Sequence, residues 1–239
     1  MFISFEGIDG VGKSTQIRFA EEYLRSKGKD VLCTLEPGGT ELGQEIRNLL
    51  LHRKGDVAPR AEALLYAADR AHHVATKVRP ALAEGKVVIT DRYLDSSVAY
   101  QGAGRKLSAD EVRNISLWAV DGLLPDLTVL VDLDPAIAAE RRKGTGEAPD
   151  RLEQEKIDFF QDVRDEFLKL AAAEPNRFLV IDATESPSEM FAHIGSPQRG
   201  QDAWLSAWIS RFSICWQVGH MRHVSSDDRL TLIWSISTR

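Results

Sequence analysis

Residues 1–14 read Met-Phe-Ile-Ser-Phe-Glu-Gly-Ile-Asp-Gly-Val-Gly-Lys-Ser, and this stretch decides the fold that we expect. The apolar run Met1–Phe5 predicts a buried strand, and the next residues match G-x-x-x-x-G-K-[ST], the pattern of a phosphate-binding loop. Such a loop needs a strand before it and a helix after it, because backbone N–H groups and the helix N-terminus together bind phosphate oxygens. Apolar residues recur at helical spacing after Lys13. The chain is therefore expected to bind a nucleoside triphosphate.

The loop residues have separate expected roles. Lys13 would reach the β- and γ-phosphates, and Ser14 would place its hydroxyl on Mg²⁺. The alternative is a chance glycine-rich turn between a strand and a helix. The alternative is disfavoured because all the fixed positions of the pattern are filled, and a strand and a helix are expected on either side of them. The residues assigned to the ATP site are Gly7, Ile8, Asp9, Gly10, Val11, Gly12, Lys13 and Ser14.

Short β-branched runs alternate with long helical segments. Strands are expected at Phe2–Phe5, Val31–Leu35, Val87–Thr90, Leu127–Val131 and Phe178–Ile181. Helices are expected around 13–27, 40–52, 59–84, 108–121, 134–143 and 153–173. Strands this apolar on both faces are typical of a parallel sheet covered on both sides. We therefore predict a three-layer α/β domain with a parallel five-stranded sheet, helices on both faces, and the active site at the carboxyl ends of the strands.

Length and charge exclude several other classes of protein. The chain has 239 residues and a formal net charge of −6, which suits one α/β domain but not a general nucleic-acid surface. No apolar run approaches the roughly 18 residues of a membrane span, and the N-terminal residues do not resemble a signal peptide. Cys33 and Cys215 have no metal-ligand spacing. We expect a cytoplasmic protein without nucleic-acid or membrane partners.

A second cluster of charged residues follows the third expected strand. Asp91-Arg92-Tyr93 comes directly after Val87–Thr90, which places a carboxylate and a guanidinium at the carboxyl end of a core strand. Asp91 can orient Mg²⁺, directly or through water, or accept a hydrogen bond from the reacting group, and Arg92 can bind a second phosphate with two N–H groups. The alternative is a surface Asp–Arg pair. Beside a phosphate-binding loop, the functional interpretation is favoured.

Six short segments now indicate a family. The chain resembles the bacterial thymidylate kinases, nucleoside monophosphate kinases that phosphorylate dTMP to dTDP with ATP and Mg²⁺. The resemblance spans residues 1 to about 194 and is carried, in the family's order, by Phe5–Gly10, Glu36–Thr40, Ala68–His73, Asp91–Tyr93, Ala99–Gly102 and Asp150–Glu153. It implies a P-loop fold of the nucleoside monophosphate kinase type and a homodimer.

The resemblance also implies which residues bind the acceptor. Asp9 would contact the acceptor nucleotide or Mg²⁺, and Arg47 and Arg92 would hold the dTMP phosphate. Tyr66 matches an aromatic position that stacks under thymine, although its apolar helical surroundings also allow a core role. The remaining implied contacts are Arg70 to the base O4, with Ser97, Tyr100 and Gln101 around the base and the deoxyribose. His72 and His73 are interpreted as packing or surface residues.

Residues 141–152 resemble the mobile lid of the family. Cations brought to the transferring phosphoryl group stabilise its charge and exclude water. Some family members carry a catalytic Arg inside the phosphate-binding loop, where this chain has Gly10 and Val11. Arg142 and Arg151 are therefore the candidates for catalytic lid residues, beside Lys13. The alternative is a solvated basic loop.

Two features depart from the family. Many bacterial members have Arg where this chain has Leu35, so one acceptor-phosphate contact would fall to Arg47. The second departure is the segment 195–239, which contains no Lys and no Glu but holds four of the five Trp residues. We predict a kinase domain at 1–194 and an atypical C-terminal tail at 195–239. A shifted reading frame or a natural extension would account for such a tail, which would be disordered or would pack as a helix.

Two rival functions remain at this point. A related P-loop deoxynucleoside kinase would not need the paired Arg47 and Arg92, because its acceptor carries no phosphate. A nucleotide-binding module without turnover is favoured only if the altered C-terminus has cost the chain its fold or its dimer.

Overall fold

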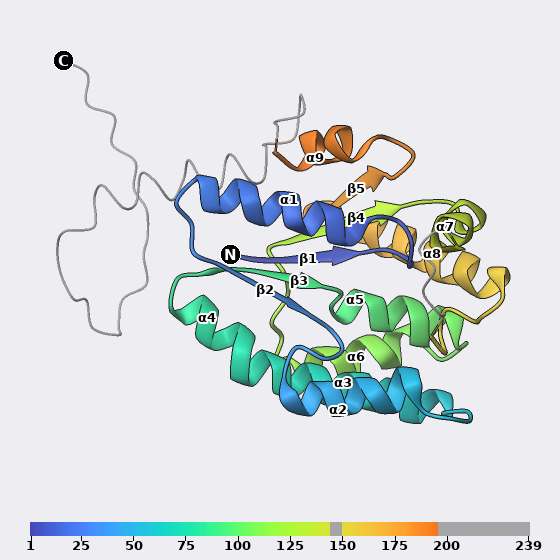
Figure 1. Ribbon diagram of the computed structural model, residues 1–239. Helices are drawn as coiled ribbons and strands as arrows, with labels where there is room; N and C mark the ends of the chain where they lie inside the picture. The colour runs from blue at the N-terminus through green and yellow to red at the C-terminus, as the bar shows by residue number, and fades with distance from the viewer. Residues whose placement is uncertain (144–149, 196–239) are drawn as a thin grey trace, which may run out of the picture.

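The computed structural model describes residues 1–143 and 150–195. Its centre is a five-stranded parallel sheet in the order β2-β3-β1-β4-β5 (Figure 1). The strands are β1 (Phe2–Glu6), β2 (Val31–Leu35), β3 (Val87–Asp91), β4 (Leu127–Asp132) and β5 (Phe178–Asp182). The predicted α/β fold is confirmed. All strands except β2 extend one residue further than predicted, and each added residue is acidic, so carboxylates gather at the carboxyl edge of the sheet.

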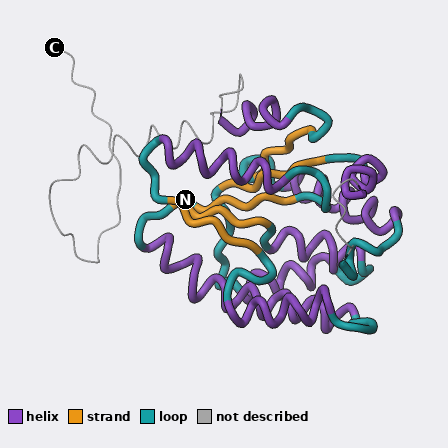
Figure 2. The backbone as a smooth tube through the Cα atoms, in the orientation of Figure 1, coloured by secondary structure: helices purple, strands orange, loops and turns teal. Residues whose placement is uncertain are grey.

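Helices cover both faces of this sheet (Figure 1, Figure 2). The helices are α1 (Lys13–Ser26), α2 (Glu41–Arg47), α3 (Pro59–His73), α4 (Arg79–Ala83), α5 (Leu94–Ser97), α6 (Ala109–Ala119), α7 (Pro135–Lys143), α8 (Ile157–Ala173) and α9 (Pro187–Gly195). Three π-helical segments continue α2, α3 and α5, namely η1 (Asn48–His52), η2 (Val74–Val78) and η3 (Val98–Gly104). Helices α1 and α9 lie on one face, while α3, α4, α5 and α6 lie on the other.

The helix formed by α5 and η3 is the main element that we did not predict. Residues 93–102 are all buried. A helix that is enclosed on every side has no polar face, so its sequence lacks the period that reveals an amphipathic helix. The helix expected at 153–173 also begins later, at Ile157, because Asp150 forms a turn first. Its Oδ1 accepts from the backbone N–H groups of Leu152 and Glu153 at 2.8 and 2.9 Å.

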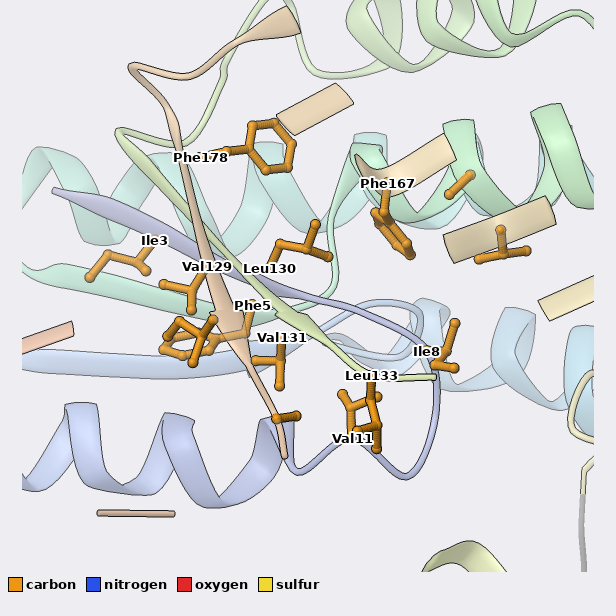
Figure 3. Packing of buried hydrophobic residues seen from close by; sticks show 14 of the residues in the cluster. Ile3, Phe5, Ile8, Val11, Val129, Leu130, Val131, Leu133, Phe167 and Phe178 are labelled. Carbon is orange, nitrogen blue, oxygen red and sulfur yellow. The ribbon is translucent and has the colours of Figure 1, made fainter. Parts of the chain in front are cut away.

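The phosphate-binding loop is attached to the hydrophobic core by its own side chains. Ile8 and Val11 are 3% and 1% exposed and belong to the same buried cluster as Ile3 and Phe5. Figure 3 shows both side chains pointing into this cluster near Leu133. Burial of these two apolar side chains fixes the backbone of the loop, so the backbone rather than the side chains is available to a ligand.

Helix α9 is the last element of the described chain and packs against α1. Ser186 and Glu189 cap it reciprocally, with Ser186 N donating to Glu189 Oε2 at 3.0 Å and Glu189 N donating to Ser186 Oγ at 3.4 Å. Phe191 packs edge-on against Phe19 and Tyr23 of α1. The predicted tail from 196 onward and the middle of the predicted lid, 144–149, lie outside the described residues. Within the described part, no helix has both the length and the apolar character to cross a membrane.

Candidate active site

The turn between β1 and α1 has the glycine geometry that phosphate binding requires. Gly7, Gly10 and Gly12 have φ angles of 133°, 87° and 99°, a region that side-chain-bearing residues rarely adopt. A Cβ atom at Gly7 would lie 2.4 Å from the Val131 carbonyl oxygen, and one at Gly10 would lie 2.6 Å from that of Ala138. The loop is thus pressed against β4 and α7, and only glycine fits at these two positions.

Lys13 is folded back over its own loop. Its Nζ donates to the carbonyl oxygens of Gly7 and Ile8 at 3.0 and 2.9 Å and lies 3.9 Å from Asp9 Oδ1. The side chain is only 7% exposed, and this burial, together with the charge of Arg92, lowers the Lys13 pKa. When a phosphate binds at the loop, the ammonium group can replace these hydrogen bonds to carbonyl oxygens with hydrogen bonds to phosphate oxygens.

Ser14 and Asp91 both line a cavity in front of the loop. Ser14 is exposed in the first turn of α1, and Asp91 ends β3. The cavity is ≈ 530 Å³ in volume and is also lined by Gly10, Gly12, Lys13, Arg92, Arg141 and Arg142. Asp91 Oδ1 is buried and has no hydrogen-bond partner in the described part of the chain. Both residues line one cavity, and a hydroxyl together with a carboxylate that has an unsatisfied oxygen is a donor set that fits Mg²⁺.

Arg92 connects the loop to the neighbouring pocket. It has a φ of 67°, and its guanidinium donates to the Gly7 carbonyl oxygen at 2.9 Å, to Asp9 Oδ1 at 2.5 Å, and to Tyr100 OH at 3.2 Å. Burial by itself would raise the Asp9 pKa, but the charges of Arg92 and Lys13 outweigh it and hold the pKa well below its usual range. Asp9 is therefore a permanent carboxylate between two cations.

A second pocket shares Asp9, Glu36, Arg47 and Arg92 with the first cavity. All the residues to which the family resemblance assigns acceptor binding line this second pocket. They are Asp9, Arg47, Tyr66, Arg70, Arg92, Ser97, Tyr100 and Gln101. Residues from five separate parts of the chain therefore meet around one space. Arg47 donates to the Pro37 carbonyl oxygen at 2.9 Å, at the boundary between the two cavities.

Arg70 lies at the inner end of the second pocket and is held from three sides. Its Nε donates to Glu36 Oε2 at 2.7 Å, and its Nη2 donates to Ser97 Oγ at 3.1 Å and to the Tyr93 carbonyl oxygen at 3.2 Å. The side chain is 1% exposed. A guanidinium with so many fixed contacts has one orientation, which suits it to recognise a single hydrogen-bond acceptor on a ligand.

One residue of this pocket, Glu36, was given no role from the sequence, and its partner His73 is buried rather than at the surface. Glu36 is quoted above within a motif but given no role, and His73 is interpreted there as packing or surface. The structure places both in one buried network: His73 Nδ1 lies 2.8 Å from Glu36 Oε1, and His73 Nε2 lies 2.8 Å from Thr34 Oγ1. The available signal was that Glu36 directly follows the expected strand Val31–Leu35, as Asp91 follows the expected strand Val87–Thr90.

The two candidate lid arginines occupy different environments. Arg142 lies in the last turn of α7 and lines the cavity in front of the loop, with its guanidinium carbon 5.0 Å from the centre of the Phe160 ring. Arg151 lines neither of these two cavities. Its Nε donates to the Leu50 carbonyl oxygen at 2.8 Å, and its Nη2 binds Glu62. The structure thus brings Arg142, but not Arg151, to the phosphate-binding loop.

Glu6 lies behind Arg92 at the carboxyl end of β1. It is fully buried, accepts from Tyr93 N at 2.8 Å, and lies 2.6 Å from Ser96 Oγ, which also accepts from Arg92. Burial, and then the nearby Asp95 carboxylate, raise the pKa of Glu6 to about 8. Glu6 is therefore mostly protonated at neutral pH, so it supports Arg92 through Ser96 without adding a second buried negative charge beside Asp9.

Glu6→Gln is expected to remove part of the pH dependence of stability. Between the unfolded pKa of 4.5 and the folded pKa of about 8, the folded protein binds a proton that the unfolded chain releases. The contribution of this group to the free energy of unfolding therefore falls as pH rises through that window, by at most about 1.4 kcal/mol per pH unit. Urea unfolding near pH 5 and near pH 8 measures the difference. Parallel pH profiles for the two proteins would contradict a protonated Glu6.

Comparisons with known proteins agree on one family. The family model described as thymidylate kinase matches residues 5–194. A thymidylate kinase of Clavibacter sepedonicus is 64% identical over 183 residues, which are 77% of this chain and 87% of the relative. One from Bifidobacterium longum (strain DJO10A) is 56% identical over 200 residues, covering 82% and 96% of the two chains. The crystal structure of thymidylate kinase from Ehrlichia chaffeensis is 32% identical, with a TM-score of 0.66 over 80% of this chain and 94% of that chain. The chain therefore belongs to the thymidylate kinase family.

Proposed function

We propose that the protein transfers the γ-phosphoryl group of ATP to dTMP and so forms dTDP and ADP. The observation that carries this proposal is the pair of adjoining cavities, which share Arg47, Arg92 and Asp9. One cavity begins at the phosphate-binding loop, and the other ends at Arg70. An acceptor whose phosphate lies between Arg47 and Arg92 therefore has its phosphate oxygen directed at the loop and its base directed at Arg70.

The reaction needs positioning and charge, and no covalent enzyme intermediate. An oxygen of the dTMP phosphate forms the new bond to the γ-phosphorus, while the bond from that phosphorus to the β–γ bridging oxygen breaks and leaves ADP. Lys13 and Arg142 face the cavity where the charge develops, so they stabilise the transferring group. The acceptor oxygen is already ionised at neutral pH, so no base has to remove a proton from it. Asp9 instead keeps Arg92 and Lys13 in place.

We assign Ser14 and Asp91 to Mg²⁺ on the strength of the unsatisfied Asp91 oxygen described above. When bound, the ion neutralises charge on the β- and γ-phosphates and holds them in one orientation. Asp91 also has a structural role that does not involve the metal ion. Its backbone carbonyl oxygen accepts from Glu36 N at 2.9 Å, so it also fixes the segment that carries Glu36 and Pro37.

A substrate panel tests the proposal against its rivals. ADP release is measured by a coupled assay with dTMP, dUMP, thymidine or no acceptor. A thymidylate kinase turns over with dTMP and not with thymidine, whereas a deoxynucleoside kinase shows the reverse. A nucleotide-binding module releases no ADP with any of them. Activity with thymidine above that with dTMP would overturn the proposal.

Tyr66 provides a test of the acceptor pocket. It is 8% exposed, belongs to the main core cluster and also lines the second pocket. Tyr66→Phe is expected to be nearly silent, since it keeps the ring. Tyr66→Ala is expected to raise the KM for dTMP, with about 1–3 kcal/mol at stake from lost stacking on an aromatic ring, and to lower stability by about 3–5 kcal/mol through loss of the buried ring. Steady-state kinetics and thermal melting measure both. An unchanged KM in the Ala variant would contradict the stacking role.

We further propose that the protein acts in the cytoplasm. We also propose that it is a homodimer. The support for a dimer is an apolar face formed by α3 and α6. Leu64 and Trp118 are 54% and 81% exposed there, beside a groove of ≈ 170 Å³ that Leu107, Val112 and Ile115 also line. Exposed apolar patches of this kind are typical of protein interfaces.

Replacing an apolar residue of this face by a charge tests the dimer. Leu64→Asp is expected to shift the protein to monomer, because an unpaired carboxylate at the centre of an apolar interface loses its hydration. Light scattering after size-exclusion chromatography measures the mass. Leu49→Asp is the matched control, since Leu49 is similarly exposed at 49% but lies in η1. Dimers in both variants would contradict an interface on α3 and α6.

A further inference from the structure

Glu62 of α3 is a fully buried carboxylate that three residues from two separate segments contact. Its side chain is 0% exposed. Oε1 accepts from Gln101 Nε2 at 2.9 Å and from Arg105 Nε at 3.2 Å, while Oε2 accepts from Arg105 Nη2 at 3.4 Å and from Arg151 Nη2. None of the roles assigned above involves Glu62, although one of its partners, Gln101, lines the second pocket.

The partners belong to different parts of the proposed enzyme. Gln101 lies in η3 and lines the acceptor pocket. Arg151 follows the segment 141–150 and is tied to η1 as well, since its Nε donates to the Leu50 carbonyl oxygen at 2.8 Å. Arg105 also pairs with Glu155 at 2.5 Å and lies with its guanidinium carbon 5.1 Å from the centre of the Phe159 ring. Glu62 is the group through which these segments meet.

The carboxylate of Glu62 sets the orientation of the Gln101 amide, whose Nε2 donates to Glu62 Oε1. An ionised carboxylate only accepts hydrogen bonds, so Gln101 must turn its NH₂ group toward Glu62. This fixes the carbonyl oxygen Oε1 as the part of the amide that remains for other partners. A neutral amide in place of Glu62 can donate as well as accept, and it would let the Gln101 amide turn over.

Stability alone does not explain why charged side chains surround Glu62 in the interior. Buried ion pairs recover little more than the cost of removing both charges from water, and well-packed apolar residues often serve stability equally well. What the ion pair with Arg151 gives instead is a fixed geometry, because Glu62 is the one carboxylate that Arg151 pairs with among the described residues. Glu62 therefore sets the positions of Arg151 and Gln101 relative to each other.

We propose that Glu62 is a positioning residue that couples the acceptor pocket to Arg151. It fixes the orientation of the Gln101 amide in the acceptor pocket and holds Arg151 at the end of the predicted lid segment. A substitution of Gln101 therefore changes the effect of a substitution of Arg151. This inference rests on the proposed dTMP kinase function, because it takes the second pocket as the acceptor site. It concerns only residues on either side of the segment 144–149.

The first test compares Glu62→Gln with Glu155→Gln. Both variants lose one carboxylate that contacts Arg105, but only the first also loses the contacts with Gln101 and Arg151. Glu62→Gln is expected to raise the KM for dTMP at least about tenfold and to leave the KM for ATP within about twofold, in the range of a lost charged hydrogen bond. Glu155→Gln is expected to leave both constants within about twofold. Equal effects of the two variants, or an equal rise in both constants for Glu62→Gln, would overturn the proposal.

The second test does not depend on Glu62→Gln folding. Gln101→Ala and Arg151→Ala are combined in a double-mutant cycle, with kcat and the KM for dTMP measured for each variant. In the described structure each of the two side chains bonds to Glu62 and not to the other, so the effects of independent residues would multiply. Coupling through Glu62 predicts a deviation of at least about threefold from the product. A product within error would overturn the proposal.

The same measurements separate failure of this inference from failure of the proposed function. If the wild-type protein has no dTMP-dependent turnover, the proposed function is wrong. If the wild type turns over dTMP and the cycle shows independent effects, only the coupling through Glu62 is wrong. Thermal melting of every variant accompanies the kinetics, since a loss of stability without a selective change in the KM for dTMP marks a purely structural role.

Discussion

Lys13→Met is expected to lower kcat at least about a hundredfold, because losing a cation that stabilises the transferring phosphoryl group commonly has an effect of that size. Methionine is the better replacement here than alanine. The Lys13 side chain is buried over the Gly7 and Ile8 carbonyl oxygens, so a residue of similar length avoids a cavity behind the loop. Turnover and thermal melting are measured together.

A second lysine on the same helix provides the control. Lys27 caps the other end of α1, is exposed, and lies far along the helix from the loop. Lys27→Met changes the net charge of the protein by the same amount and is expected to keep turnover within about twofold, as is usual for an exposed residue away from the chemistry. Turnover of Lys13→Met within about threefold of the wild type would contradict the role assigned to Lys13.

Arg92→Ala is expected to weaken both substrates and to destabilise the protein, whereas Arg47→Ala is expected to weaken dTMP only. The family resemblance places both arginines on the acceptor phosphate. The structure adds that Arg92 also binds Asp9 and the Gly7 carbonyl oxygen, so its loss leaves Asp9 without its main cation. Removing one partner of a largely buried ion pair costs about 3–5 kcal/mol of stability. Arg47 lines both cavities and donates to the Pro37 carbonyl oxygen, and among the described residues it forms no ion pair with a carboxylate.

Calorimetric titration of each nucleotide measures this difference. The ratio of the two dissociation constants is expected to change for Arg47→Ala and to stay nearly constant for Arg92→Ala. Arg92→Lys keeps the charge but cannot make the several separate N–H contacts that Arg92 makes, so it is expected to recover stability better than it recovers binding. Unchanged ATP affinity in Arg92→Ala would show that Arg92 serves the acceptor alone.

The sheet and the positions of most site residues were predictable because each had a local signal. The strands are apolar on both faces, so they show as continuous runs, and the phosphate-binding loop has fixed spacing. The residues that line the second pocket came from family resemblance. Composition and period alone would not have selected Ser97 or Gln101, which lie on a helix without a polar face.

What the sequence did not reveal are interactions between buried charges of distant segments. Glu62 is a single carboxylate before the apolar run Ala63–Ala68, and nothing in that local pattern marks it as buried. It is nevertheless fully buried, in contact with arginines that follow it by 43 and 89 positions. His73 is likewise buried through Glu36 and Thr34, from the neighbouring strand and loop. Such partners become adjacent only when the sheet has formed, so no local pattern marks them.

The position of β1 in the sheet has a consequence for the making of the protein on the ribosome. β1 emerges first, but its two neighbours in the sheet, β3 and β4, pair with it at Val88 and Leu127 and emerge much later. Until then the apolar strand that leads into the phosphate-binding loop lacks both of its neighbours in the sheet, and an apolar strand exposed in this way is a site where aggregation can begin. The first site residues to be translated are thus among the last to become functional, since α1 is covered only when α9 and its Phe191 have left the ribosome tunnel.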